Sequence, residues 1–170
     1  EFYGNKIRGI IPPEICNIVN VEEISLGHNQ LTGGIPECLT YISGLDLYLH
    51  RNQLGCWIYD YTCDPEGQND DCCIVHCDDS GGACSGQIPE WNTWATIIYL
   101  VDNQFRGLVP ASLCDEFWQF HIYDNYLCPP YPYECTVEGG AYCPVVGYWG
   151  ASCNQDTTEN CYLAEQNTMY

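Results

Sequence analysis

The sequence predicts an α/β-type solenoid: a short array of about five coils with one disulfide-rich insertion and a cysteine-rich C-terminal cap. Three observations lead to this fold class. A frame centred on asparagine recurs along the chain, one copy of it is interrupted, and cysteines are dense in the interruption and after the last copy. The 170 residues divide accordingly into repeats at 1–54 and 86–127, an insertion at 55–85 and a cap at 128–170.

The frame reads apolar-x-apolar-x-x-Asn and is followed in full copies by Gly-x-Ile/Val-Pro. Its asparagines stand 22 to 24 residues apart, except across the interrupted copy: Asn5, Asn29, Asn52, Asn103 and Asn125. Alternating apolar residues predict a short strand with one buried face. The asparagine amide is suited to backbone groups that a tight turn leaves unpaired. One coil cannot bury its apolar face alone, so the coils are expected to stack.

The stretch 15–36 carries the frame most completely, at Ile15, Ile18, Val21, Ile24, Leu26, Asn29, Leu31, Gly33, Ile35 and Pro36. It resembles the plant-type extracellular leucine-rich repeat, LxxLxxLxLxxNxLxGxIPxx, and its period falls in the range of such repeats. The resemblance covers both repeat segments. It implies a stacked solenoid whose strands form a concave face.

Cysteine usage indicates the compartment. The chain has 14 cysteines, an even number, together with 16 glycines and 10 prolines. Such density is typical of secreted proteins in oxidising surroundings. Zinc sites are the competing interpretation, but the usual CxxC pairs are missing. We therefore expect disulfides and an extracellular, secreted protein.

The charge balance excludes two classes of partner. There are 23 acidic residues against 4 basic ones, a net charge of −19. Nucleic acid requires a basic surface, so it is not an expected partner, and neither is an anionic membrane. No apolar run approaches the roughly 18 residues of a membrane-spanning helix, so we expect no membrane insertion.

The interruption separates Asn52 from Gly86 and contains six cysteines, which could pair among themselves. Near the end of the chain, Cys128 and Cys135 follow the last frame seven residues apart, which resembles the C-terminal cap of plant-type repeats. Cys56 and Cys63 have the same spacing at the start of the insertion. The resemblance thus predicts the disulfides Cys56–Cys63 and Cys128–Cys135. The remaining connectivity stays open.

The insertion also carries acidic residues in the segment 64–71. Asp64, Glu66, Asp70 and Asp71 are candidate calcium ligands, although their spacing is not that of an EF-hand, and a solvated loop is the alternative. Calcium is the one cofactor considered. The string at 79–82, Asp-Ser-Gly-Gly, matches the motif around a protease nucleophile, but the rest of such an enzyme is absent. No nucleophile–base pair is evident, so no enzyme is predicted.

Strand residues that alternate with the core positions should project from the concave face. The candidates there are aromatic and histidine side chains: Tyr48, Tyr99, Tyr123, Trp118, His28, His50 and His121. Such side chains suit sugar rings, peptides or a neighbouring subunit. The alternative is that they only decorate an exposed sheet.

Glycans are a further expected feature of the C-terminal segment. No Asn-x-Ser/Thr sequon occurs, so N-glycosylation is not expected. The tract at 129–133 looks like the proline-tyrosine tracts of plant and algal wall proteins. The O-glycosylation candidates are Pro129, Pro130, Pro132, Thr157 and Thr158.

Two functions from different classes follow. The first is a non-enzymatic structural protein that assembles end to end into a filament or wall layer, because the sequence starts inside a strand motif at Phe2 without a capping segment. The second is a recognition module that binds a protein, peptide or glycan on its concave face, similar to polygalacturonase inhibitors or receptor ectodomains.

Overall fold

The computed structural model describes residues 2–77, 84, 86–93, 95–115, 119–128, 162–163 and 168–169. Several predictions made above fall on other residues, namely Trp118, Pro129, Pro130, Pro132, Cys135, Thr157 and Thr158. Those predictions, and any that depends on the side chain of Asp70, lie outside what the structure describes.

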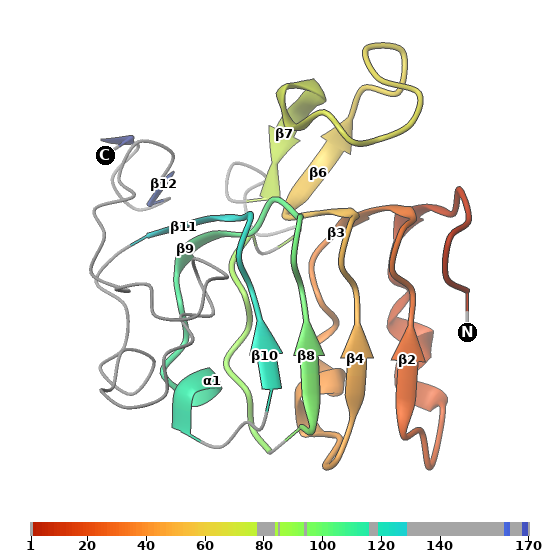
Figure 1. The fold of residues 1–170 in the computed structure, drawn as a ribbon, viewed down its shortest axis with the longest axis vertical. Coiled ribbons are helices and arrows are strands. Elements are labelled where there is room, and N and C mark those ends of the chain that lie inside the picture. The colour runs from red at the N-terminus through yellow and green to blue at the C-terminus, as the bar shows by residue number, and fades with distance from the viewer. Residues whose placement is uncertain are drawn as a thin grey trace.

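The apolar-x-apolar segments form one parallel sheet, in the order β10-β8-β4-β2 (Figure 1). Its strands are β2 (Glu23–Ser25), β4 (Asp46–Tyr48), β8 (Ile97–Tyr99) and β10 (Gln119–His121). The register aligns the frame, since Ile24 pairs with Leu47, Leu47 with Ile98, and Ile98 with Phe120. The strand prediction is thus confirmed for these copies, and β8 pairs directly with β4 although the insertion separates them in sequence.

A second set of parallel strands follows the asparagines. One sheet contains β1 (Arg8–Ile10), β3 (Gln30–Gly33) and β5 (Gln53–Leu54), and β9 (Arg106–Leu108) pairs with β11 (Tyr126–Cys128). The frame does not predict these strands, because their short sequences mix glutamine and glycine with apolar residues. The repeated parallel strands fit a solenoid-like fold.

Short helical turns follow the prolines of the frame: η1 (Pro13–Asn17), η2 (Glu37–Tyr41) and α1 (Ser112–Asp115). A proline suits the start of such a turn, since its φ angle is already helical and the first N–H groups of a helix have no partner. A disulfide between Cys16 and Cys38 joins η1 to η2. Cys16 is the fourth residue of η1 and Cys38 is the second residue of η2, so the bridge links positions that differ by two between successive coils.

The core is filled by the apolar positions of the frame. Leu47, Leu49, Ile98 and Leu100 of the concave strands are fully buried, as is Phe105 beyond the asparagine corner. Burying a side chain of this size contributes about 1.5–3 kcal/mol to folding. The coils therefore share one continuous apolar core.

The insertion forms an antiparallel hairpin of β6 (Cys56–Tyr59) and β7 (Cys73–His76), preceded on its second arm by η3 (Asp70–Cys72). In Figure 1 this hairpin projects beyond the coils. A further antiparallel pair, β12 (Tyr162–Leu163) and β13 (Thr168–Met169), lies near the C-terminus. Among the described residues, no helix is long and apolar enough to cross a membrane.

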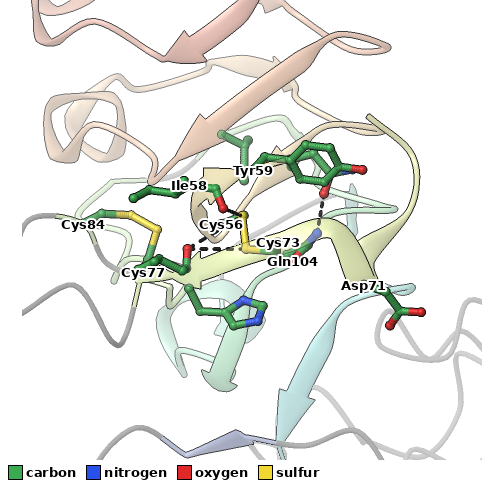
Figure 2. The surroundings of a disulfide bond; sticks show 12 residues. Cys56, Ile58, Tyr59, Asp71, Cys73, Cys77, Cys84 and Gln104 are labelled. Atoms are coloured by element: carbon green, nitrogen blue, oxygen red, sulfur yellow. Dashed lines mark hydrogen bonds between the residues drawn. A yellow bond between two sulfur atoms is a disulfide. The ribbon is translucent and has the colours of Figure 1, made fainter. Parts of the chain in front are cut away.

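The prediction of a Cys56–Cys63 bridge is wrong. Cys56 is bonded to Cys73 across the hairpin, with Cα atoms 5.9 Å apart (Figure 2), and Cys63 is bonded to Cys72. The reason is that β6 is extended and leads the chain away from Cys56, so that only the opposite strand can supply a partner. Cys77 pairs with Cys84. Cys128 is disulfide-bonded, and since Cys135 is outside the described residues, the Cys128–Cys135 bridge stays a prediction.

Candidate functional site

Each coil turns from the concave sheet into the second sheet at an asparagine. Asn52 illustrates the contacts: its Nδ2 donates to the carbonyls of Leu49, His50 and Leu26, while its Oδ1 accepts from the N–H of Leu31. Asn29, Asn103 and Asn125 make the corresponding contacts. The prediction that this amide satisfies turn backbone is confirmed, and the corner is thereby fixed in these four copies.

The residue before each asparagine has a left-handed backbone. His28, Arg51, Asp102 and Asp124 have φ between 53° and 59°, and Gly4 occupies the same place in the first coil with φ 70°. This conformation is uncommon for residues with a side chain. It is imposed by the asparagine contacts, and it lines up these side chains as a row along the rim of the concave sheet. We call this row the corner row.

The predicted histidines and tyrosines do come together on the concave face. Their ring centroids form a continuous series, 4.8 Å from Tyr3 to His28, 5.1 Å to His50, 4.7 Å to Tyr99 and 4.9 Å to His121. Tyr48 and Tyr123 join it at 6.4 Å from Tyr99 and His121. These distances suit tilted and edge-to-face contacts. We call the seven rings the aromatic face.

Tyr3 was not among the predicted residues, although the sequence contains a signal for it. It stands two residues before Asn5, as His50 stands two residues before Asn52. The backbone confirms this equivalence, because the N–H of Phe2 donates to Ser25 and that of Gly4 donates to Gly27 as in the later strands. Counting strand positions back from Asn5 would therefore have identified Tyr3.

Gly27 makes room for the histidines. A Cβ at this position would lie 2.6 Å from Cε1 of His50 and 2.9 Å from its Nδ1, far inside van der Waals contact. His50 can therefore lean over Gly27 and approach Tyr3, 5.8 Å away between ring centroids. Any larger residue at 27 would separate these rings and break the series.

The histidines of the aromatic face are uncharged at neutral pH. Burial, followed by the nearby His28 and Arg51, lowers the pKa of His50 from 6.5 to about 4. Burial also lowers the pKa of His28, assisted by Arg51 and opposed by Asp102, and it lowers the pKa of His121. A desolvated imidazole prefers its neutral form. On a chain of net charge −19, this face is thus a neutral patch.

The insertion is held against the second sheet by polar contacts. Gln30 donates through its Nε2 to the carbonyls of Pro65 and Glu66, and Gln53 donates to that of Gly67. Arg8 donates to Pro65 and lies 3.9 Å above the ring of Tyr61. The loop that follows β6 therefore folds back over the coils.

A cavity of about 510 Å³ lies between this loop and the corner row. We call it the corner groove. Six of the side chains that line it are Lys6, His28, Arg51, Glu66, Gln68 and Asp102. It lies beside the aromatic face, since His28 belongs to both.

The candidate calcium ligands are not gathered into a metal site in the described part of the chain, where no group of three or more acidic, cysteine or histidine side chains is placed to hold an ion. Asp64 instead closes its own loop, accepting from the N–H groups of Glu66, Gln68 and Asn69 and from the hydroxyl of Tyr59. These bonds lower the pKa of its carboxyl. Glu66 pairs with Lys6 at 3.0 Å.

Residues 20–42 match the family model described as Leucine Rich Repeat, and this segment spans β2, the corner at Asn29, β3 and η2. This segment is a leucine-rich repeat. Among solved structures, the chain is similar to the crystal structure of a plant ice-binding protein, with 19% identity and a TM-score of 0.39. The match covers 94% of this chain and 50% of that one, so the chain spans half its length. A comparison with curated proteins found no match.

Proposed function

We propose that this protein is an extracellular, non-enzymatic recognition module that binds a protein or peptide on its aromatic face. The observation that carries the proposal is the unbroken series of rings from Tyr3 to Tyr123 across the concave strands. Leucine-rich repeats are commonly protein-interaction modules, and the disulfides are consistent with a location outside the cell.

The chemistry of the aromatic face favours a protein partner. Tyrosines are enriched at the centres of interfaces because they bury a large area at low entropic cost, whereas acidic residues are depleted there. The rings also rest on a sheet fixed by the asparagine corners, so little ordering is needed on binding. The neutral histidines avoid the desolvation cost that charged side chains would bring.

The test is cross-linking and affinity capture from the extracellular fluid of the source organism, followed by affinity measurement with each captured protein. Replacing Tyr48 and Tyr99 by alanine should weaken binding of a true partner by roughly a hundredfold, as expected for central tyrosines. Tyr41→Ala is the matched control, since Tyr41 is 60% exposed at the end of η2, away from the concave strands. Equal binding by both variants would contradict the proposal.

End-to-end assembly into a filament or surface layer is the second candidate. Ile10, Ile18 and Val19 of the first described coil are 46%, 53% and 79% exposed, which offers an apolar surface for a neighbouring copy. Calcium or glycans would have to offset the charge of −19. Sedimentation velocity with and without calcium tests this, because Val19→Asp should abolish any large species, and a monomer under both conditions contradicts assembly.

A further inference from the structure

The corner groove has features of a ligand site that the aromatic face does not share. Its volume of about 510 Å³ falls in the usual range for small-molecule sites, roughly 300–1,000 Å³. It is built from segments far apart in the sequence, with the corner row on one side and the loop around Glu66 on the other. The insertion thus completes a cavity that the repeats alone would leave open.

Both walls of the groove are fixed. The corner row is held by the asparagine contacts, and the loop is held by Asp64, whose Oδ2 accepts from the N–H groups of Gln68 and Asn69 at 2.6 and 2.8 Å. Gly67 closes the turn with φ 69° and packs against Gln30, where a Cβ would lie 3.1 Å from Cγ. A ligand would therefore meet a preformed site.

The charges in the groove are balanced. Lys6 pairs with Glu66 at 3.0 Å, and Nε of Arg51 lies 3.5 Å from Oδ2 of Asp102. Two of the four basic residues of the chain thus line one cavity, each beside a carboxylate. An anionic ligand would meet Glu66, Asp102 and the overall negative charge, while a cation would meet Lys6 and Arg51. The balance favours an uncharged ligand.

The remaining polar atoms suit hydroxyl groups. The terminal amino groups of Arg51 have no hydrogen-bond partner within the described residues, and all four charged side chains of the groove are at least 57% exposed. Each basic group lies beside a carboxylate, so donors and acceptors lie next to each other, and vicinal hydroxyls can match them because each one both donates and accepts. At one end, the ring of His28 lines the groove and offers a face for the C–H face of a sugar, and Tyr3 packs against this ring with centroids 4.8 Å apart.

We infer that the corner groove binds a neutral oligosaccharide, with Arg51 and Asp102 hydrogen-bonding its hydroxyls and His28, supported by Tyr3, stacking on a ring. This site is separate from protein binding at the centre of the aromatic face. The insertion supplies Glu66 and Gln68 to the second wall. Its role is then to convert an open corner of the repeat array into a saccharide site.

The experiment titrates the full chain with cellohexaose, xylohexaose, mannohexaose and hexagalacturonic acid, followed by calorimetry and by NMR shifts of backbone amides. The expected result is that one neutral hexasaccharide binds and shifts Gly4, Arg51 and Gly67, while the acidic one binds at least tenfold more weakly. Absence of any neutral ligand up to about 10 mM, which corresponds to negligible affinity, would overturn the inference, as would preference for the acidic probe.

Arg51→Gly is the decisive variant. Glycine accepts the left-handed backbone at this position, as Gly4 already does, so the substitution removes the guanidinium without straining the corner. We expect roughly tenfold or greater loss of saccharide affinity. Asp124→Gly is the matched control, because Asp124 has φ 55° in the same row but does not line the groove. If Arg51→Gly does not fold, Glu66→Gln on the loop serves instead, and unchanged affinity in the folded variant overturns the inference.

Discussion

The repeat coils and the inserted hairpin are held together by different interactions, although they adjoin at Gly55. A coil is fixed by a buried apolar row and by one asparagine that serves both its own backbone and that of its neighbour, as Asn52 serves Leu49 and Leu26. The hairpin has a small cluster of Cys56, Tyr59 and Cys72 and is bridged by disulfides.

The difference shows how each region depends on its surroundings. A coil is stabilised by its neighbours, so damage to one corner propagates along the array. The hairpin is stabilised within itself and contacts the coils mainly through polar groups such as Gln30, Gln53 and Arg8. We therefore expect mutations in the coils to lower global stability, and mutations in the hairpin to act locally.

The largest effect should come from Asn52→Ala. This removes one donor from each of three backbone carbonyls, which all keep another donor, and it removes the partner of the N–H of Leu31, in a corner where Asn52 is 2% exposed. The unsatisfied buried N–H costs about 1–3 kcal/mol and each lost bond to a carbonyl about 0.5–1.5 kcal/mol, so we expect a loss of about 3 kcal/mol or more in the free energy of unfolding. Urea denaturation measures it.

The control for that prediction is Asn5→Ala at the edge of the array. Asn5 is exposed, and its amide donates only to the carbonyls of Phe2 and Tyr3. We expect a loss below about 1 kcal/mol, because water can replace these bonds. Equal losses for the two variants would mean that the buried corner contacts add nothing beyond those at the edge.

The next effect concerns the disulfides of the hairpin. The double variant Cys56→Ala/Cys73→Ala should remove about 3 kcal/mol of stabilisation from the hairpin, as expected for closing a loop of this length. Hydrogen exchange should rise within β6 and β7 and stay unchanged in β4 and β8. Faster exchange in β4 would show that the coils depend on the hairpin.

Thiol counting tests the pairing itself. Cys63→Ala/Cys72→Ala removes both members of a bridge and should add no free thiol to those of the unmodified protein, whereas Cys56→Ala/Cys63→Ala should add two, at Cys72 and Cys73. If instead Cys56→Ala/Cys63→Ala added no free thiol and Cys63→Ala/Cys72→Ala added two, the result would support the Cys56–Cys63 bridge predicted from the resemblance to the cap.

Sequence predicted the coils well because their stabilising interactions are periodic. Asn29, Asn52, Asn103 and Asn125 recur with the apolar rows that they terminate, so the strand, the corner and the exposed face follow from counting. Tyr3 was not predicted as part of the aromatic face because it lies at the edge of the pattern. The strands of the second sheet were not predicted because β3 and β5 are set by pairing between coils rather than by local composition.

The hairpin could not be predicted in the same way. Its bridges depend on which strand Cys56 faces, and spacing along the chain says nothing about that. The acidic segment was open to two interpretations, because a carboxylate such as Asp64 can hold either a cation or a set of backbone N–H groups. The corner groove could not be predicted from the sequence either, because it exists only where the loop returns to the coils.

Acid should affect the two regions in different pH ranges. His50 has a folded pKa of about 4 against 6.5 in a model peptide, so the unfolded chain binds its proton first. The contribution of neutral His50 to the free energy of unfolding is fully present above pH 6.5 and is lost as the pH falls to about 4. In His50→Phe this dependence should disappear, which thermal unfolding between pH 7 and pH 4 measures. Identical slopes in the two proteins would contradict the assignment.

The smallest and most local effect should come from Asp64. Its bonds with backbone N–H groups lower the folded pKa below 3.8, so the stability it gives the loop is present above pH 3.8 and is lost as the pH falls through the folded value. Asp64→Asn should reproduce that loss at pH 7, with faster hydrogen exchange at Gln68 and Asn69 and little change in the coils. Since the same loop forms one wall of the corner groove, the variant should also weaken any saccharide bound there, whereas His50→Phe should leave the loop amides protected.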